Sequence, residues 1–330
     1  MREGLSQVCA NPDLVAQFTF STTPPWKLVE PVVDLSLRKY LKNSTNELVF
    51  RASFNELRHK YSRYHAIYTD GSKAMNRVAA AATGRDASLQ IRLPDDASIF
   101  TAELQALDMA FDLIENSDSH QFIVFTDSLS SLLALKGHEP KHPALLALRE
   151  AYSNLVQLQK SVVLAWVPSH VGIRGNEKVD ALAKEALQLD VTNLYLPHTD
   201  YRPKINGYVK LKWQELWDSF PENKLHRIKP TVGTVSNPPP RKRRDDLVLT
   251  RARIGHTYLT HAYLLHGDER PYCIPCDCAV TVSHILVDCY EYSHIRQKYY
   301  TVPNLEALFE HTDPSLVLGF LKESKLYSKF

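Results

Sequence analysis

Four acidic residues stand where strands and helices of one predicted domain begin or end. Asp70 follows the first predicted strand, and Glu103 lies in the first turn of a predicted helix. Asp127 directly follows an apolar strand, and Asp180 lies one turn into the last predicted helix. Four ionised carboxylates in one crevice would raise one another's pKa values, and divalent cations would remove that conflict. Mg²⁺ binds a few carboxylates and keeps water and phosphate oxygens as its remaining ligands.

This residue set is suited to phosphodiester hydrolysis, because two such ions would stabilise both the attacking water and the leaving oxygen. Singly, Asp127 could simply start a helix and Glu103 could simply favour a helix dipole, so the prediction depends on their joint placement. His170 adds a group that could deliver water or pass a proton, from a loop that contains Gly172 and Gly175. The alternative is an ordinary exposed loop histidine. Asn176 is predicted to cap the final helix.

The elements that must position these residues are predicted between residues 61 and 189. Alternating and apolar runs predict five strands and the spacing of apolar residues predicts the helices, in the order three strands, helix, strand, helices, strand, helix. The sequence Asp70-Gly71-Ser72 predicts a sharp turn at the end of the first strand. We therefore expect an α/β domain with a mixed five-stranded sheet and flanking helices. Pairing of the first and fourth strands would bring Asp70 and Asp127 into one crevice.

The remaining chain divides into three parts. Residues 1–60 are predicted to be an N-terminal extension with one helix near Asn46–Tyr61. Residues 190–245 form a proline-rich, basic linker with short helices such as Val209–Phe220, and residues 246–330 form a small C-terminal module. The run Arg241-Lys242-Arg243-Arg244 could be a nuclear-import signal or a phosphate contact, and we favour a solvated linker.

Composition excludes several classes of protein. A hydrophobic content of 44% and a charged content of 23% in 330 residues are typical of folded domains. No apolar run approaches the ~18 residues of a membrane span, and no secretory signal is recognisable. Five cysteines, an odd number, favour a reducing intracellular compartment, the nucleus or the cytoplasm. Residues 61–188 carry 12 Lys and Arg against 15 Asp and Glu, so a nucleic acid bound there would need locally recruited cations.

The C-terminal module contains residues of the types that bind zinc. Cys273, Cys276, His284 and Cys289 would suit tetrahedral Zn²⁺, and Cys278 could replace Cys276. The spacing matches no standard finger, and the alternative is a group of buried thiols that pack as small hydrophobic residues. Either nucleic-acid binding or local stabilisation would be a role for such a module.

Taken together, the motifs resemble those of type 1 ribonuclease H. Tyr68-Thr69-Asp70-Gly71-Ser72, Thr101-Ala102-Glu103-Leu104, Thr126-Asp127-Ser128 and the segment from His170 to Ala183 occur in the family's order. The resemblance implies Asp70, Glu103, Asp127 and Asp180 as ligands of two Mg²⁺ or Mn²⁺ ions, with His170 in a flexible catalytic loop. It also implies cleavage of the RNA strand of RNA–DNA hybrids, leaving a 3′-hydroxyl and a 5′-phosphate. Gly71, Ser72 and Asn176 are the expected nucleic-acid contacts.

A second resemblance extends beyond these motifs. Pro24-Pro25-Trp26, Arg253-Ile254-Gly255-His256-Thr257 and Leu259-Thr260-His261 are similar to segments of jockey-like non-LTR retrotransposon polyproteins, and so is the Cys/His cluster before His284-Ile285-Leu286. The resemblance implies a zinc knuckle and a C-terminal fragment that follows a reverse transcriptase. No Tyr-x-Asp-Asp polymerase signature is present. The alternatives are a transposase or integrase on the same fold, and an inactive nucleic-acid-binding remnant of a retroelement.

Overall fold

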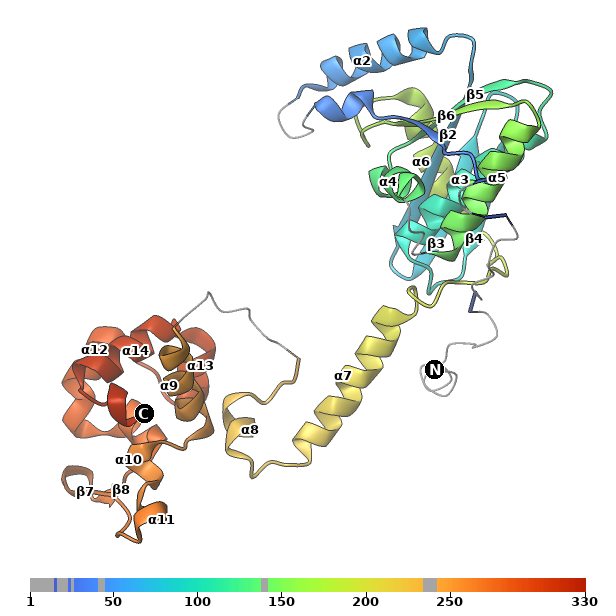
Figure 1. The fold of residues 1–330 in the computed structure, drawn as a ribbon. Helices are drawn as coiled ribbons and strands as arrows, with labels where there is room; N and C mark the ends of the chain where they lie inside the picture. Colours follow the sequence, from blue (N-terminus) through green and yellow to red (C-terminus); the bar gives the residue numbers. More distant parts are fainter. Residues whose placement is uncertain (1–14, 17–22, 25–26, 41–44, 138–141, 234–241) are drawn as a thin grey trace. The chain divides into compact units, whose positions relative to one another are not determined.

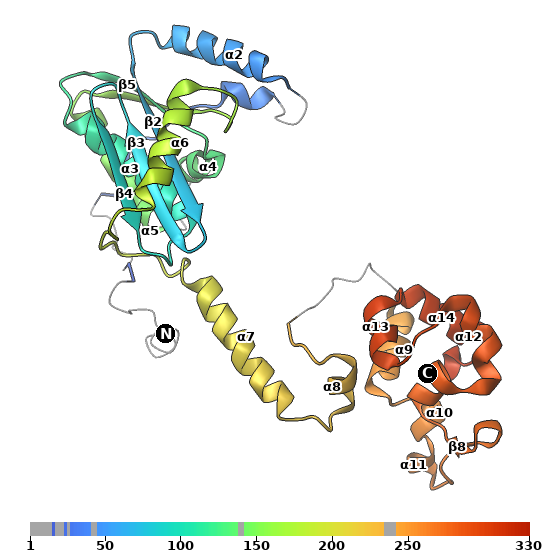
Figure 2. The same cartoon turned by 180° about the vertical axis from the view of Figure 1, so that it is seen from behind.

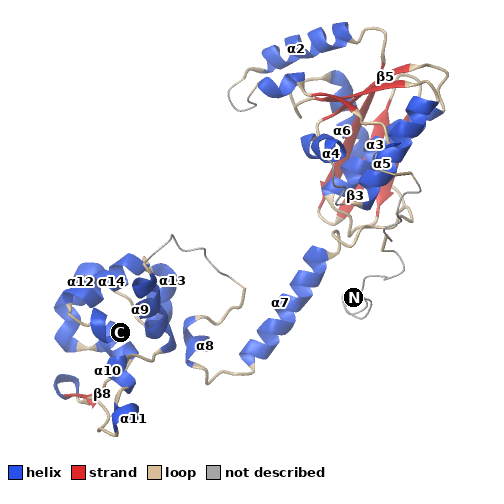
Figure 3. Cartoon of the chain, viewed as in Figure 1, coloured by secondary structure: helices blue, strands red, loops and turns tan. Residues whose placement is uncertain are grey.

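The structure is a computed structural model that describes residues 15–16, 23–24, 27–40, 45–137, 142–233 and 242–330. It divides into unit 1, residues 1–205, and unit 2, residues 206–330. Figure 1 shows the elements of both units, and Figure 3 shows that unit 1 holds the large sheet whereas unit 2 is mostly helical. Pro25 and Trp26 of the predicted Pro24-Pro25-Trp26 motif, and Arg241 of the predicted basic run, lie outside the described residues.

Unit 1 is built around one six-stranded sheet with the strand order β1-β6-β5-β2-β3-β4. β2, β3 and β4 form an antiparallel meander, whereas β1, β6, β5 and β2 are paired in parallel. The strands are β1 (Val32–Asp34), β2 (His65–Ala74), β3 (Arg77–Thr83), β4 (Ser88–Leu93), β5 (Gln121–Thr126) and β6 (Ser161–Trp166). The α/β prediction with a mixed sheet is confirmed, but the prediction of five strands is wrong. The sixth strand is β1, which lies in the predicted N-terminal extension and is too short to show a period of two.

Helices cover both faces of the sheet. Figures 1 and 2 show α3 (Ile99–Glu115) and α5 (Pro143–Gln157) on one face and α6 (Arg174–Ala186) on the other. A short helix, α4 (Leu129–Lys136), follows β5, and α2 (Glu47–Lys60) begins after the capping side chain of Asn46, close to the predicted helix. The apolar run of β5 is buried because helices pack against it from both sides.

Small residues allow the helices to approach β3. Its four alanines, residues 79–82, are fully buried. Ala79 packs against Ala186 and Leu187, and Ala81 packs against Val179 and Ala183 of α6. Close approach brings the functional side chains of α3 and α6 toward the centre of the sheet.

The predicted turn at Asp70-Gly71-Ser72 is wrong. β2 continues through these residues to Ala74, and the chain reverses at Met75, whose φ is 53°. Gly71 is needed for packing, because a Cβ there would lie 3.0 Å from the backbone nitrogen of Glu103 and 3.1 Å from the Cβ of Ala102. A glycine in a strand can therefore mark the close approach of another backbone instead of a turn.

The segment after α6 packs against unit 1. Asp200 is buried and accepts hydrogen bonds from the Ser98 backbone N–H at 3.0 Å and from the Thr101 hydroxyl at 2.6 Å. These residues form the first turn of α3 and its N-cap. The first part of the predicted linker thus stabilises the helix that carries Glu103.

Unit 2 has its own apolar core, made largely by α9 (Arg243–Ile254), α14 (Pro314–Glu323) and the segment around Leu286. Its remaining regular elements are short. They are α8 (Lys224–Ile228), α10 (Tyr258–His261), α11 (Tyr263–His266), β7 (Tyr272–Cys273), β8 (Cys278–Ala279), α12 (Ser293–Tyr299) and α13 (Leu305–His311). The predicted helix Val209–Phe220 corresponds to α7 (Arg202–Asp218), which spans the boundary between the units. No helix in the described part of the chain is long and apolar enough to span a membrane.

Candidate active site

Three of the predicted acids converge where β2, β5 and α3 meet. Thr69 of β2 pairs with Thr126 of β5, so that Asp70 and Asp127 are the next residues on two neighbouring parallel strands. Glu103 reaches the same place from near the start of α3. One carboxylate oxygen from each of these three residues lies within 4.8 Å of the others. We call Asp70, Glu103 and Asp127 the acid cluster.

Asp70 and Glu103 are buried and Asp127 is half-buried, which makes the negative charge of the acid cluster costly. Burial, with the nearby charges of Asp127 and Asp180, raises the pKa of Asp70 to about 8. Burial, with the charges of Asp70 and Asp127, raises the pKa of Glu103 to about 9. The Oε2 atom of Glu103 is buried and has no hydrogen-bond partner among the described residues. These carboxylate oxygens have few positively charged partners, and oxygens of this kind are the ligands that a divalent cation such as Mg²⁺ or Mn²⁺ prefers.

Asp180 lies beside the acid cluster but belongs to a second group. Its charge acts on Asp70 and on Asp127, which places it near both. Its carboxylate accepts a 2.7 Å hydrogen bond from Lys184, and a ligand atom of Asp180 lies within 4.8 Å of ligand atoms of His170 and Glu177. The structure therefore brings three predicted acids together and joins the fourth to His170. Asp180 is also in the second turn of its helix, because α6 begins at Arg174.

The predicted capping role of Asn176 is wrong. Ile173 is the N-cap of α6, and Asn176 lies inside the helix with 2% of its surface exposed. Burial raises the pKa of Asp127, whereas a hydrogen bond from the Asn176 side chain lowers it. This contact with Asp127 was missed in the sequence. The spacing could have revealed it. Asn176 and Asp180 are four residues apart and share one face of a helix, so an Asp180 that points to the other acids implies that Asn176 points the same way.

The loop that carries His170 is held by α2. Val171 and Ile173 are buried in the same apolar cluster as Phe50 and Leu57 of that helix. The Arg51 Nε donates a 3.4 Å hydrogen bond to the Val171 carbonyl. Sequence reasoning placed the extension outside the functional domain, whereas one of its helices contacts this loop.

The other predicted nucleic-acid contacts follow Asp70 on β2. Gly71 packs against the start of α3, and Ser72 is half-buried opposite Ala79 of β3. Both lie one or two residues from the acid cluster.

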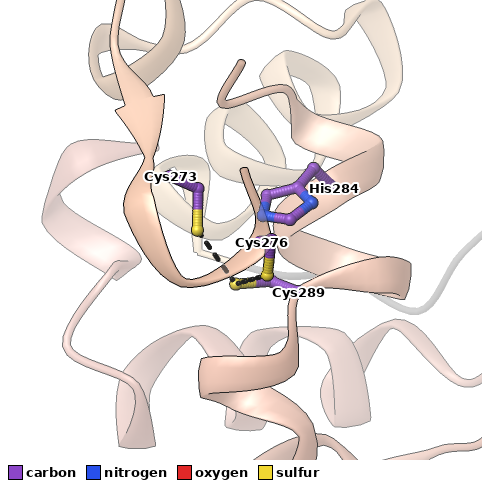
Figure 4. Close-up of side chains that lie close together, drawn as sticks. All are labelled: Cys273, Cys276, His284 and Cys289. Carbon is purple, nitrogen blue, oxygen red and sulfur yellow. Dashed lines mark hydrogen bonds between the residues drawn. The ribbon is translucent and has the colours of Figure 1, made fainter. Parts of the chain in front are cut away.

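The four predicted zinc ligands meet in unit 2, as Figure 4 shows. The Sγ atom of Cys289 lies 3.9 Å from that of Cys273 and 3.9 Å from that of Cys276. Tetrahedral Zn–S bonds of about 2.3 Å imply sulfur–sulfur separations of about 3.8 Å, so these thiols fit a zinc site. His284 completes a set whose ligand atoms all lie within 4.8 Å of one another. We call these four residues the Cys/His cluster.

Cys278 lies next to the Cys/His cluster. Its Sγ is 3.4 Å from the His284 Nδ1, but the set of four mutually close ligand atoms contains Cys276. The Tyr290 backbone N–H donates to the Cys276 sulfur, and this hydrogen bond lowers the pKa of the thiol. A stabilised thiolate at Cys276 is the form that binds a metal.

Part of unit 1 is similar to a known family of proteins. The described part of unit 1 combines a mixed sheet, helices on both faces of it, and an acid cluster at the ends of two parallel strands. Residues 62–188 match the family model described as RNase H. This match identifies an RNase H domain in this part of the chain and supports an enzyme of the ribonuclease class.

Solved structures of RNase H proteins also match this region. RNase H1 from the halophilic archaeon Halobacterium salinarum is 24% identical with a TM-score of 0.32, and the match covers 38% of this chain and 97% of that one. The N-terminal RNase H domain of a Mycobacterium tuberculosis protein is 23% identical with a TM-score of 0.31, covering 38% and 93%. LC11-RNase H1 in complex with an RNA/DNA hybrid is 19% identical with a TM-score of 0.31, covering 37% and 96%.

Proposed function

We propose that unit 1 hydrolyses the RNA strand of RNA–DNA hybrids with two Mg²⁺ or Mn²⁺ ions. The observation that carries this proposal is the acid cluster, in which oxygen atoms of three carboxylates lie within 4.8 Å of one another inside the segment that matches RNase H. Asp70, Glu103, Asp127 and Asp180 would hold the ions. When bound, the ions supply stabilisation of the attacking water and of the leaving oxygen.

The chain's own residues have distinct parts in this proposal. Asn176 orients the Asp127 carboxylate through its hydrogen bond, which opposes the rise in the pKa of Asp127 that burial causes. Near Asp180, His170 can accept or pass a proton at an imidazole nitrogen. Gly71 and Ser72 follow Asp70 directly, and in this proposal they contact the strand being cut, where 2′-hydroxyls in the shallow minor groove distinguish RNA from DNA.

A cleavage assay on a labelled RNA–DNA hybrid tests the proposal. Wild-type protein should cut the RNA strand in Mg²⁺ and not in EDTA, leaving 3′-hydroxyl and 5′-phosphate ends. Asp70→Asn should lower the rate by about 10²–10³-fold or more, because an ion ligand is lost at the reacting centre. Asp112→Asn is the matched control, since Asp112 is an exposed acid on α3 outside the acid cluster. Full activity of Asp70→Asn in Mg²⁺ would refute the assignment.

The same assay separates the alternative functions. Equal cleavage of duplex DNA, or strand transfer into it, would favour a transposase or integrase. Binding of the hybrid without cleavage by the wild type would favour an inactive remnant. We also propose an origin in a jockey-like retroelement and an intracellular location, on the basis of the motifs around Gly255 in unit 2 and the odd number of cysteines.

We further propose that the Cys/His cluster binds one Zn²⁺ through Cys273, Cys276, His284 and Cys289. The sulfur separations of 3.9 Å support this assignment, and so does the short length of the surrounding elements. β7 and β8 have two residues each, which is too little to be stable without a crosslink. The role proposed for the ion is local stabilisation of unit 2.

A further inference from the structure

A second functional feature of unit 1 is a cavity of about 420 Å³ near the start of β2. Its lining comes from the end of α2, the start of β2, the turn between β3 and β4, and the first turns of α6. The lining residues that matter here are Arg58, Arg63, Tyr68, Arg85, Gly175 and Lys178. We call it the basic cavity.

The charge of the basic cavity has one sign. Three arginines and Lys178 line it, and its lining contains no Asp or Glu. Elsewhere in unit 1, Lys60, Lys184 and Lys204 each form an ion pair with an aspartate. Within the described residues, none of the four cations of the cavity has such a partner. This arrangement concentrates positive charge that the protein itself does not neutralise.

Arg58 is held in place and presents an unused donor. Its guanidinium lies over the ring of Phe125 at 5.8 Å, and Tyr68 stacks on the same ring at 5.1 Å. The Nη1 atom is buried and has no hydrogen-bond partner in the described part of the chain. Buried polar groups are nearly always hydrogen-bonded, so this donor adds to the positive charge at the cavity that the described residues leave unsatisfied.

The start of α6 adds to the positive potential. Gly175 lies in the first turn of this 13-residue helix, where the helix dipole is positive. A Cβ at Gly175 would lie 2.2 Å from the Tyr68 ring, so glycine is required for the helix to lie against the tyrosine. Guanidinium groups and a helix N-terminus on one cavity are a combination that recognises phosphate.

The position of the cavity connects it to the acid cluster. Tyr68 and Asp70 are two residues apart on β2, so their side chains point to the same face about 7 Å apart. α6 borders both places, through Gly175 and Lys178 at the cavity and through Asp180 at the acids. At ~3.4 Å of rise per nucleotide, this separation corresponds to about two nucleotides.

We propose that the basic cavity binds a backbone phosphate of the nucleic acid that enters the acid cluster. The inference rests on the proposed nuclease function and adds a contact made partly by α2, which lies outside the segment that matches RNase H. The cavity would gather positive charge at one place beside the nucleic acid, although residues 61–188 as a whole carry more acidic than basic residues. It would also fix the position of the strand along β2.

The salt dependence of binding tests this inference on the full chain. The probe is a labelled RNA–DNA hybrid, and every protein carries Asp70→Asn so that cleavage does not interfere. The test variant is Arg85→Gln/Lys178→Gln, which removes two exposed cations of the cavity. The control variant is Arg38→Gln/Lys39→Gln, which removes two exposed cations of unit 1 outside the lining.

We expect the test variant to bind the hybrid about 10-fold more weakly at low salt. The slope of log K against log[KCl] should become shallower by about 1–2, since fewer counterions are released when fewer phosphate contacts form. The control should keep the slope of its Asp70→Asn parent. Equal slopes for test and control variants would overturn the inference. Failure of the nuclease proposal would be seen separately, as wild-type protein that does not cut the hybrid.

Discussion

Unit 1 gathers the three carboxylates of the acid cluster and unit 2 gathers the four side chains of the Cys/His cluster, but they do so in opposite ways. The ligands of the acid cluster come from long elements that are more than 20 residues apart in the chain, and strand pairing sets their positions. The ligands of the Cys/His cluster lie within 17 consecutive residues, on two-residue strands and single turns. The first site is positioned by a folded core, whereas the second must itself hold its short elements together.

This difference predicts that removing a ligand has opposite effects on the stability of the two units. The carboxylates of the acid cluster repel one another when they are ionised, because the fold holds them close together where burial raises their pKa values. Unit 1 should therefore fold without a metal and bind it for catalysis. In unit 2 the thiols have no disulfide to replace the ion among the described cysteines, so folding around the Cys/His cluster should depend on zinc.

The largest effect is expected in unit 2. Cys289→Ser should reduce bound zinc from about one equivalent to none and lower the Tm of unit 2 by roughly 10 °C or more, because a buried ligand is lost. Metal analysis and hydrogen exchange of residues 270–300 measure this. Cleavage of the hybrid should change less than about 2-fold, since the acid cluster is built from unit 1 alone.

Cys278→Ser is the matched control, because Cys278 is outside the set of four mutually close ligand atoms. It should keep its zinc. A Cys278→Ser protein that loses zinc, beside a Cys276→Ser protein that keeps it, would reverse the ligand assignment. Cleavage that falls together with zinc content would contradict the independence of the two units.

A smaller effect is expected in unit 1, where the stability of the metal-free protein should depend on pH. Here the loss of an acidic ligand should raise stability, whereas the loss of Cys289 should lower it. The folded-state pKa of Asp70 is about 8, whereas its ordinary value is 3.8. Between these values the folded state binds more protons than the unfolded state, so stability should fall as pH rises from about 4 to about 8. Each pKa unit of difference corresponds to about 1.4 kcal/mol, so even part of the shift is measurable.

The measurement is hydrogen exchange of β2 and β5 in EDTA at pH 5 and pH 8, corrected for the intrinsic effect of pH on exchange. Asp70→Asn should flatten the pH dependence and stabilise the metal-free protein at pH 8. Mg²⁺ should protect the wild type more at pH 8 than at pH 5. Asp112→Asn serves again as the control. If Asp70→Asn lowered the stability of the metal-free protein at pH 8, repulsion among the carboxylates of the acid cluster would not destabilise the fold.

Much of unit 1 could be predicted because its signals are local and periodic. The apolar run of β5 and the helical spacing of α3 each fix one element, and the α/β class follows from their order. The approach of Asp70 to Asp127 followed from one assumption about strand pairing, which the register confirms. The pairing of β1 with β6 had no such signal, because a three-residue strand depends on the sheet it joins.

The errors at the site arose where tertiary contacts overrode a local preference. The residue types of Asp70-Gly71-Ser72 are typical of a turn, but the start of α3 packs against Gly71 and β2 continues through all three residues. Asn176 is a favoured capping residue, but the helix begins earlier and its amide is buried against Asp127. The partnership of α2 with the His170 loop depends on packing between segments 120 residues apart, which spacing alone does not encode.

The smallest effect tests how finely packing positions the acid cluster. Gly71→Ala would place a methyl group 3.0–3.2 Å from backbone and Cβ atoms of Ala102 and Glu103, so α3 must shift by a few tenths of an ångström. Overpacking of this kind costs about 1–3 kcal/mol. The Glu103 carboxylate would move with its helix, and we expect cleavage to fall by about 10-fold with a weaker response to Mg²⁺ concentration.

Gly137→Ala is the matched control, because a Cβ there meets its nearest atoms at an ordinary 3.5 Å. Its stability and its Mg²⁺ response should stay close to those of the wild type. If Gly71→Ala lost stability but kept the wild-type Mg²⁺ response, the position of Glu103 would be set by the ions and not by the approach of α3 to β2. In that case the acid cluster would resemble the Cys/His cluster as we propose it, with a metal that organises its own ligands.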